Sequence, residues 1–319
     1  MRVLLITISI FVLCGCTKFQ SVKSQTSNFS ILLPENQVNE LEIPQAEPLP
    51  QDECASLVAA KEKPGAFLRI LKSALSIFKI EKAHAIITRH DIPDADYIVA
   101  DGDYPALVGL FGPNDCIATL VQNDFLITVA HCAVEVTVGS NLTIGGSVVA
   151  VDQVLLHPEW NDDEDENDIA LIHLATPVNN VTPIPLYTLQ DEMGKIISIV
   201  GRGVYATGLE GEAGAVEDPN MRRVTNQISA VDNMFLEVTF ESPDDPAVTA
   251  LEGVGAAGDS GSPGFIDVNG VAHIAGLNSW GDGEDTGVGV GEYTAKDYQT
   301  RVSQYTDWLR ASGVCIPTN

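Results

Sequence analysis

From Ile86 onward the sequence consists of short runs rich in β-branched residues, separated by Gly, Pro, Asn and Asp. Such runs are too short and too regularly interrupted for helices, so they predict strands joined by turns. The predicted strands are 106–110, 117–121, 126–129, 148–156, 169–174, 196–200, 236–240 and 271–277. One late helix is predicted at 299–309, where apolar residues recur along one side. The segment therefore has the pattern of an all-β sandwich or barrel.

The first residues have the composition of an export signal. A cationic start is followed by an apolar run that ends in the box Leu-Cys-Gly-Cys, whose last residue is Cys16. This order resembles a bacterial lipoprotein signal, in which residues 1–15 are removed and Cys16 is lipidated. An ordinary signal peptide or a short membrane anchor is the alternative, and either would also export the chain. Thr17, rather than an aspartate, follows Cys16 and resembles the pattern of outer-membrane destinations.

Two further segments precede the predicted strands. Residues 16–65 are rich in Ser, Gln, Asn, Glu and Pro, which predicts a disordered tether. Residues 66–85 contain apolar residues at helical spacing with Arg and Lys between them, which predicts a basic amphipathic helix. This helix is interpreted as a pro-segment that docks on an acidic domain, with a helix lying on a membrane surface as the alternative.

Charge narrows the range of partners. The chain has 17 basic and 44 acidic residues and a formal net charge of -27, so it lacks the positive surface of a nucleic-acid-binding protein. Cationic substrates or a cationic pro-segment are the expected partners. The acidic run at 162–166 is interpreted as a solvated loop or an adventitious calcium site, with a preference for basic substrates as the alternative.

Three short motifs carry the chemistry of a serine nucleophile. Such a reaction needs an activated hydroxyl, an imidazole base, a carboxylate that orients the imidazole, and donors for the oxyanion. The turn Gly-Asp-Ser-Gly-Ser-Pro contains Ser260, the strand end Thr-Val-Ala-His-Cys contains His131, and the strand start Asn-Asp-Ile-Ala-Leu contains Asp168. Each motif alone is weak evidence, because a histidine, an acid or a serine can be structural. Together they are highly specific.

In the order His, Asp, Ser, the motifs resemble the chymotrypsin-type (trypsin-like) serine peptidases over about 86–312. The resemblance implies an all-β fold of two six-stranded antiparallel β-barrels with a C-terminal helix. It further implies that His131 is the general base, Asp168 its orienting acid and Ser260 the nucleophile. The backbone N–H groups of Gly258 and Ser260 would form the oxyanion hole. By the same resemblance, Ser279, Trp280 and Gly281 belong to the strand that pairs with the substrate backbone.

The resemblance also implies a disulfide between Cys116 and Cys132, which pins the histidine loop. If Cys16 is lipidated, Cys54 and Cys315 remain, and a bridge between them is predicted to keep the pro-segment attached after activation. The enzyme would then stay anchored when cut.

The sequence leaves two alternatives for the primary specificity pocket. Val254 stands where trypsins hold an acid, and Gly281 and Gly291 are expected to leave the pocket walls without side chains. This favours an apolar pocket for aromatic or large aliphatic residues. The alternative is that Glu252 or Glu284 turns inward and favours Lys or Arg.

Activation in this family generally needs a new apolar N-terminus that pairs with the acid before the nucleophile, here Asp259. The nearest equivalent of that N-terminus is Ile86, which cleavage after Ala85 would expose. The alternatives are a cut after Lys82, or an uncut active form in which Arg89 neutralises Asp259.

The sequence thus predicts a serine endopeptidase that works through an acyl-enzyme and is made as a zymogen. It is expected to be extracytoplasmic, either lipid-anchored to a bacterial membrane, with the outer membrane favoured, or secreted. Its expected partners are a protein or peptide substrate, a membrane through the lipid, and an activating protease, with no nucleic acid, cofactor or metal. The alternatives are a catalytically silent binding or adhesion protein and an esterase using the same residues.

Overall fold

The computed structural model describes residues 86–112, 115–161, 166–282 and 287–316. The predicted signal (1–15), tether (16–65) and pro-segment (66–85) lie outside the described residues, together with Cys16 and Cys54. Within the described ranges, no helix has the length and apolar character required to cross a membrane. The predicted peptidase domain at 86–319 contains all the described residues.

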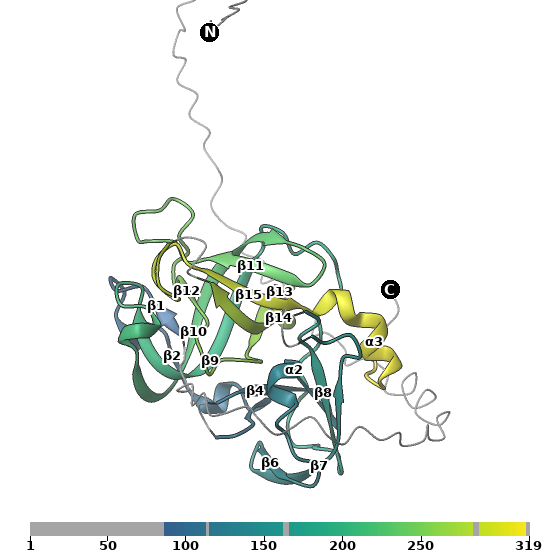
Figure 1. Ribbon diagram of the computed structural model, residues 1–319. Coiled ribbons are helices and arrows are strands. Elements are labelled where there is room, and N and C mark those ends of the chain that lie inside the picture. Colours follow the sequence, from purple (N-terminus) through teal and green to yellow (C-terminus); the bar gives the residue numbers. More distant parts are fainter. Residues whose placement is uncertain (1–85, 113–114, 162–165, 283–286, 317–319) are drawn as a thin grey trace, which may run out of the picture. The chain divides into compact units, whose positions relative to one another are not determined.

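The first half of this region forms a six-stranded sheet in the order β3-β4-β5-β8-β7-β6, with antiparallel neighbours (Figure 1). Its strands are β3 (Leu107–Gly109), β4 (Ile117–Gln122), β5 (Phe125–Thr128), β6 (Asn141–Ile144), β7 (Ser147–Leu156) and β8 (Ala170–Leu174). Their inward residues, among them Leu120, Leu126 and Ile172, form a compact apolar cluster. The central strands are nearly continuous runs of buried apolar residues, as expected for strands covered on both faces.

The second half forms a closed ring of six strands, because β9 pairs with both β10 and β13. Around the ring the order is β9-β10-β11-β15-β14-β13. The strands are β9 (Ile196–Thr207), β10 (Val216–Val231), β11 (Phe235–Thr239), β13 (Pro263–Val268), β14 (Val271–Asp282) and β15 (Lys296–Arg301). Three two-residue strands extend the sheet: β1 (Ile87–Thr88), β2 (Ile98–Val99) and β12 (Gly253–Val254). The prediction of two six-stranded antiparallel barrels is confirmed.

Between Ile86 and Ile316 the described helices are few and short. In the described ranges the α-helices are α2 (Ala130–Ala133) and α3 (Thr306–Ala311), and the 3₁₀ turns are η1 (Asp94–Asp96), η2 (Asp101–Asp103), η3 (Glu212–Gly214) and η4 (Val302–Tyr305). The terminal helix predicted at 299–309 begins later than expected, because Gln299 to Arg301 complete β15 by pairing with β14. The helical part follows as η4 and α3, and Leu309 joins an apolar cluster with Ile127 and Leu277 that spans both sheets.

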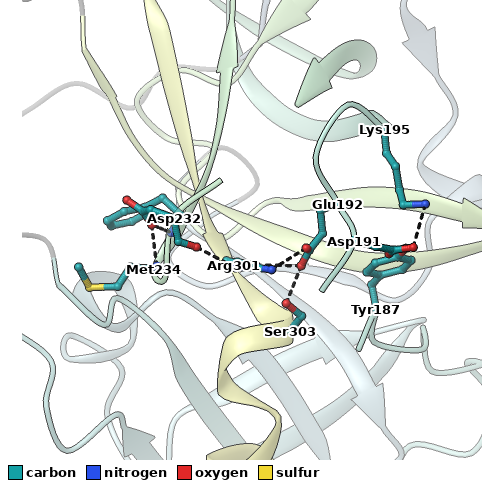
Figure 2. Close-up of polar contacts among 9 residues, drawn as sticks. Tyr187, Asp191, Glu192, Lys195, Asp232, Met234, Arg301 and Ser303 are labelled. Atoms are coloured by element: carbon teal, nitrogen blue, oxygen red, sulfur yellow. Dashed lines mark hydrogen bonds and ion pairs between the residues drawn. The ribbon is translucent and has the colours of Figure 1, made fainter. Parts of the chain in front are cut away.

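A buried ion pair fastens the chain where β15 passes into η4. Arg301 donates to both carboxylate oxygens of Glu192, over 3.0 Å and 2.8 Å, and Ser303 Oγ donates to the same carboxylate over 2.5 Å (Figure 2). The remaining Arg301 nitrogen donates to the carbonyl oxygen of Asp232 over 2.9 Å. Both charged groups are thereby hydrogen-bonded at several atoms, which is the condition under which a buried pair is tolerated.

Candidate active site

The structure brings His131 and Asp168 together from the ends of neighbouring strands. β5 ends at Thr128 and leads into the single turn of α2, which carries His131, while Asp168 stands just before β8. The Asp168 carboxylate accepts a hydrogen bond from the backbone N–H of His131 over 2.9 Å, and its second oxygen lies 2.8 Å from His131 Nδ1. Because one carboxylate binds both the backbone and the ring, the position and the tilt of the imidazole are fixed together.

Asp168 is itself held by the second barrel. Its side chain is 2% exposed and accepts a hydrogen bond from Ser279 Oγ over 2.7 Å, while its carbonyl oxygen accepts one from Thr300 Oγ1 over 2.8 Å. Burial alone would raise the pKa of Asp168, but the hydrogen bonds and charge from His131, with the hydrogen bond from Ser279, lower it on balance. Asp168 is therefore ionised at neutral pH and favours an Nδ1–H tautomer of His131.

Ser260 lies in a turn that is clamped against the first barrel. Its carbonyl oxygen accepts a hydrogen bond from Ile117 N over 2.7 Å and lies 3.8 Å from Cys132 Sγ, the residue after His131. The next residue, Gly261, has a φ of +79° and an ideal Cβ there would stand 2.1 Å from Ile117 O. Only glycine fits this contact, so the Gly after the serine sets how closely Ser260 approaches the His131 loop.

The backbone before Ser260 presents unused donors. Gly258 has a φ of +96°, a backbone conformation that favours glycine and reverses the chain direction just before Ser260. Within the parts of the chain that the structure describes, neither the Gly258 N–H nor the Ser260 N–H donates to a protein acceptor. Two free amides that flank one turn can together bind an oxyanion.

The disulfide between Cys116 and Cys132 is present and ties the start of β4 to the His131 turn. Because its sulfurs are bonded to each other, their proximity to His131 offers no thiolate ligand for a metal. Cys315 is also disulfide-bonded, whereas its predicted partner Cys54 lies outside the described residues.

Asp259, next to Ser260, is fully buried and only partly satisfied. One carboxylate oxygen accepts from Ala256 N over 3.3 Å, and the other has no hydrogen-bond partner in the described structure. Burial raises the pKa of Asp259 well above its ordinary value. An ideal Cβ on Gly201 would be 2.0 Å from the unpartnered oxygen and 3.1 Å from Ile86 Cδ1, so Ile86 and Asp259 meet across a glycine.

Ile86 and its neighbours are inserted into the second barrel. Ile86 and Ile87 are both completely buried, and Ile87 pairs with Val254 on one side and with Ala206 on the other. Arg89 forms its ion pair with Asp91, over 2.6 Å, and so does not neutralise Asp259 as the uncut alternative required.

The predicted pocket residues are only partly together. Val254 is buried in an apolar cluster with Ile87. Gly291 also faces Ile87, because an ideal Cβ there would be 1.9 Å from Ile87 Cδ1. Gly281 does not lie opposite Gly291. It pairs with Asp297 of β15, a residue that no sequence motif indicated.

The acids expected as alternatives do not supply the pocket with a charge in the described structure. Glu252 accepts a hydrogen bond from Thr249 N over 2.7 Å, and burial raises its pKa to about 8. Glu284 lies outside the described residues.

Comparison with known proteins agrees with the fold. The family model described as Trypsin matches residues 98–309, so the chain belongs to the trypsin family of serine proteases. Similar proteins include Trypsin Blo t 3 of Blomia tropicalis, 27% identical over 244 residues, which cover 68% of this chain and 84% of the relative. A trypsin of Phaedon cochleariae is 27% identical over 61% of this chain and 77% of the relative. Duodenase-1 of Bos taurus is 27% identical over 62% and 77%, respectively.

Proposed function

We propose that the protein is a serine endopeptidase with Ser260 as nucleophile, His131 as general base and Asp168 as the acid that orients it. The observation that carries this proposal is the doubly bonded His131–Asp168 pair, set beside the clamped turn of Ser260. Membership of the trypsin family supports the same assignment. Protein or peptide chains are the substrates.

In the proposed reaction His131 Nε2 removes the proton of Ser260 Oγ as the oxygen attacks the carbonyl carbon of the scissile bond. The carbonyl oxygen becomes an oxyanion and accepts hydrogen bonds from the N–H groups of Gly258 and Ser260. Collapse of the tetrahedral intermediate breaks the C–N bond, and the protonated His131 gives its proton to the leaving amine. Water, deprotonated by His131, then hydrolyses the acyl-enzyme and regenerates Ser260. Activity should fall at acidic pH, where a protonated His131 cannot act as a base.

Active-site labelling tests this proposal directly. A fluorophosphonate probe should label the activated wild-type protein and fail to label Ser260→Ala. Ser262→Ala is the matched control, because Ser262 is a buried serine in the same turn whose hydroxyl has no hydrogen-bond partner. Its labelling should remain. Wild-type protein that takes up no label would overturn the enzyme assignment in favour of a silent binding protein, and labelling with turnover of esters but no peptides would indicate an esterase.

We further propose activation by a cut after Ala85, which would release the α-amino group of Ile86 beside Asp259. The burial of Ile86, the glycine gap at Gly201 and the unpartnered oxygen of Asp259 support this step. The new ammonium group would supply the cation that the buried carboxylate lacks. N-terminal sequencing of active protein should begin at Ile86. A start at Ala83 would indicate a cut after Lys82, and an uncut active chain would exclude the zymogen step.

We propose an extracytoplasmic location, with the chain either anchored through a lipid on Cys16 to a bacterial membrane, of which the outer membrane is favoured, or secreted. A Cys54–Cys315 bridge would keep the lipid-bearing segment attached after the cut. Mass analysis of the cut protein without reductant should find the two pieces joined, and with reductant should find them separate. Release of the segment without reductant would contradict the bridge.

A further inference from the structure

The loop between β9 and β10 reaches the backbone that precedes the candidate nucleophile. This loop contains η3, which begins at Glu212. The Oε1 atom of Glu212 accepts a hydrogen bond from the backbone N–H of Ala257 over 2.7 Å, across 45 positions of the sequence. Ala257 stands three residues before Ser260. A hydrogen bond from an amide to a carboxylate is stronger than one to a neutral oxygen, so this contact can hold the turn of Ser260 in place.

The peptide unit between Ala257 and Gly258 carries the Gly258 N–H, one of the two proposed oxyanion donors. The unit before it is held by Glu212 through the Ala257 N–H. The unit after it is held through the Asp259 N–H, which donates to Ala256 O over 3.0 Å. Within the described parts of the chain the Gly258 N–H itself donates to no protein acceptor. Because glycine has wide backbone freedom, the position of this N–H depends on how well the two flanking units are fixed.

The backbone of Glu212 is itself hydrogen-bonded to its surroundings. Its N–H donates to Val290 O, in the segment between β14 and β15, over 2.9 Å. Its carbonyl oxygen accepts from Ala215 N over 3.2 Å, and Gly211, the residue before it, donates to Thr207 O over 2.9 Å. The carboxylate that holds Ala257 therefore projects from a fixed stretch of backbone.

The charge of Glu212 acts on the buried acids behind the turn. Burial raises the pKa of Asp259 and that of Asp297, and the negative charge of Glu212 raises both further. Carboxylates of like charge repel one another whenever they are ionised together. Glu212 is thus poorly placed for stability alone, and its contact with the turn of Ser260 points to a role in function.

We propose that Glu212 is a positioning residue of the oxyanion hole. Its carboxylate holds the Ala257 N–H, and this contact sets the place of the Gly258 N–H that receives the oxyanion of the substrate. Glu212 acts through the backbone and does not touch the reacting atoms. The inference rests on the proposed peptidase function and adds to it a residue that belongs to none of the sequence motifs. Oxyanion donors stabilise the transition state more than the bound substrate, so loss of Glu212 should lower kcat and leave KM nearly unchanged.

Three substitutions separate the hydrogen bond of Glu212 from its charge. In the activated full-length protein, with a peptide substrate that the wild type cleaves, Glu212→Ala should lower kcat by about 10-fold and change KM by less than about 3-fold. Glu212→Gln keeps an acceptor on a side chain of the same length and should retain at least about a third of the wild-type kcat. Glu212→Asp keeps the charge, but its shorter side chain does not reach Ala257 N, so it should resemble Glu212→Ala.

Glu210→Ala is the matched control for these variants. Glu210 lies in the same loop, but its carboxylate accepts from Thr207 Oγ1 and not from the turn of Ser260. Its removal should leave kcat within about 2-fold of the wild-type value, because surface substitutions away from the site have small effects.

A pair of inhibitors supplies a readout that a merely structural role would not move. In a peptide aldehyde, Ser260 Oγ adds to the carbonyl carbon and gives its proton to His131, so that the former carbonyl oxygen lies in the oxyanion hole. The matching peptide alcohol binds without forming this bond. Glu212→Ala and Glu212→Asp should lose about 10-fold in affinity for the aldehyde and bind the alcohol as the wild type does.

The outcomes separate this inference from the peptidase proposal. Equal losses of affinity for both inhibitors, a Glu212→Asp variant with the wild-type kcat, or a Glu212→Gln variant as impaired as Glu212→Ala would overturn the role of Glu212, while Ser260 is still labelled by the fluorophosphonate. Absence of labelling in the wild type would overturn the peptidase proposal and this inference together. If Glu212→Ala does not fold, the Asp and Gln variants decide, because both keep a polar side chain at the position.

Discussion

Buried carboxylates in two regions of the second barrel differ in how their charge is balanced. Glu192, at the junction of β15 and η4, is bound by Arg301 and Ser303 and so has a cation and a hydroxyl donor (Figure 2). Asp259 and Asp297, behind the candidate nucleophile, are equally buried but accept hydrogen bonds from amides, with no ion pair to either among the described residues. Burial raises the pKa of both.

This difference in charge balance distinguishes a carboxylate that stabilises the fold from carboxylates that lie beside the candidate active site. The cation at Glu192 is Arg301, a residue of β15, so this ion pair stabilises the folded arrangement of the chain at that junction. At Asp259 the cation would come from outside the described fold, as the proposed new N-terminus, and at Asp297 the described residues form no ion pair. An unbalanced buried charge costs stability until its partner binds, which makes it suitable for a site and unsuitable for a scaffold.

Removal of Arg301 should have the largest effect. Arg301→Leu leaves Glu192 buried without its cation, and we expect a loss of about 3–5 kcal/mol in the free energy of unfolding. Urea unfolding at pH 7 measures it. Glu192→Leu combined with Arg301→Leu should recover much of the loss, because no charge is then left buried. A loss below about 1 kcal/mol for the single variant would show that the two regions do not differ as described.

Asp259→Asn should lower activity without lowering stability, the opposite of what is expected for Arg301→Leu. In the activated protein we expect kcat/KM to fall by on the order of 10²–10³, because in the proposed activation an amide at residue 259 would not pair with the Ile86 ammonium group, and the oxyanion donors would lose that support. The uncut protein should be no less stable than the wild type, since the substitution removes a buried charge without a partner. Kinetics on the cut form and thermal unfolding of the uncut form check the two halves. A variant that is fully active after the cut would contradict the role of Asp259.

The sequence allowed the fold class and the three central residues to be predicted because their signals are local. Short β-branched runs specify strands wherever they lie, and His131, Asp168 and Ser260 each stand in a motif of five or six consecutive residues. The sequence did not predict the long strand β10 (Val216–Val231). Polar residues are frequent along it, so the alternation of apolar and polar side chains typical of a strand is hard to recognise. Its buried Arg222 depends on Asp94, 128 residues away, for two hydrogen bonds, and on the ring of Tyr205.

Asp297 could not be found in the same way, because its position depends on pairing across strands. Counting along a glycine-rich segment placed the pocket wall at Gly291, whereas the β14–β15 ladder places Asp297 opposite Gly281. The same ladder explains why the last helix starts late, since Gln299 is needed in β15. A usable signal was the alternation of the polar residues Asp297, Gln299 and Arg301 with Tyr298, Thr300 and Val302, residue types that are common in strands.

The pH dependence of stability should show the unbalanced charge of Asp297. Its ordinary pKa is 3.8 and its folded pKa is about 7, so the folded state retains the proton longer than the unfolded state. Stability from this group is complete below about pH 4 and declines as the pH rises toward 7. In Asp297→Asn this component should be absent, which we expect to reduce the decline between pH 4.5 and 7.5 by on the order of 2 kcal/mol. Urea unfolding at both pH values measures it, and parallel declines in the two proteins would contradict the assignment.

The smallest effect on stability is expected for a carboxylate that has an ion-pair partner but is exposed to solvent. Asp307 in α3 pairs with Arg310 over 3.1 Å, and its side chain is 99% exposed. Water solvates this charge in the folded and unfolded states alike, so the ion pair adds little, in contrast to Glu192 with Arg301. Asp307→Asn should shift the thermal midpoint by less than about 1 °C at low and high salt. A clear destabilisation that disappears in high salt would show that charge balance matters at the surface too, and that burial is not what distinguishes the two regions.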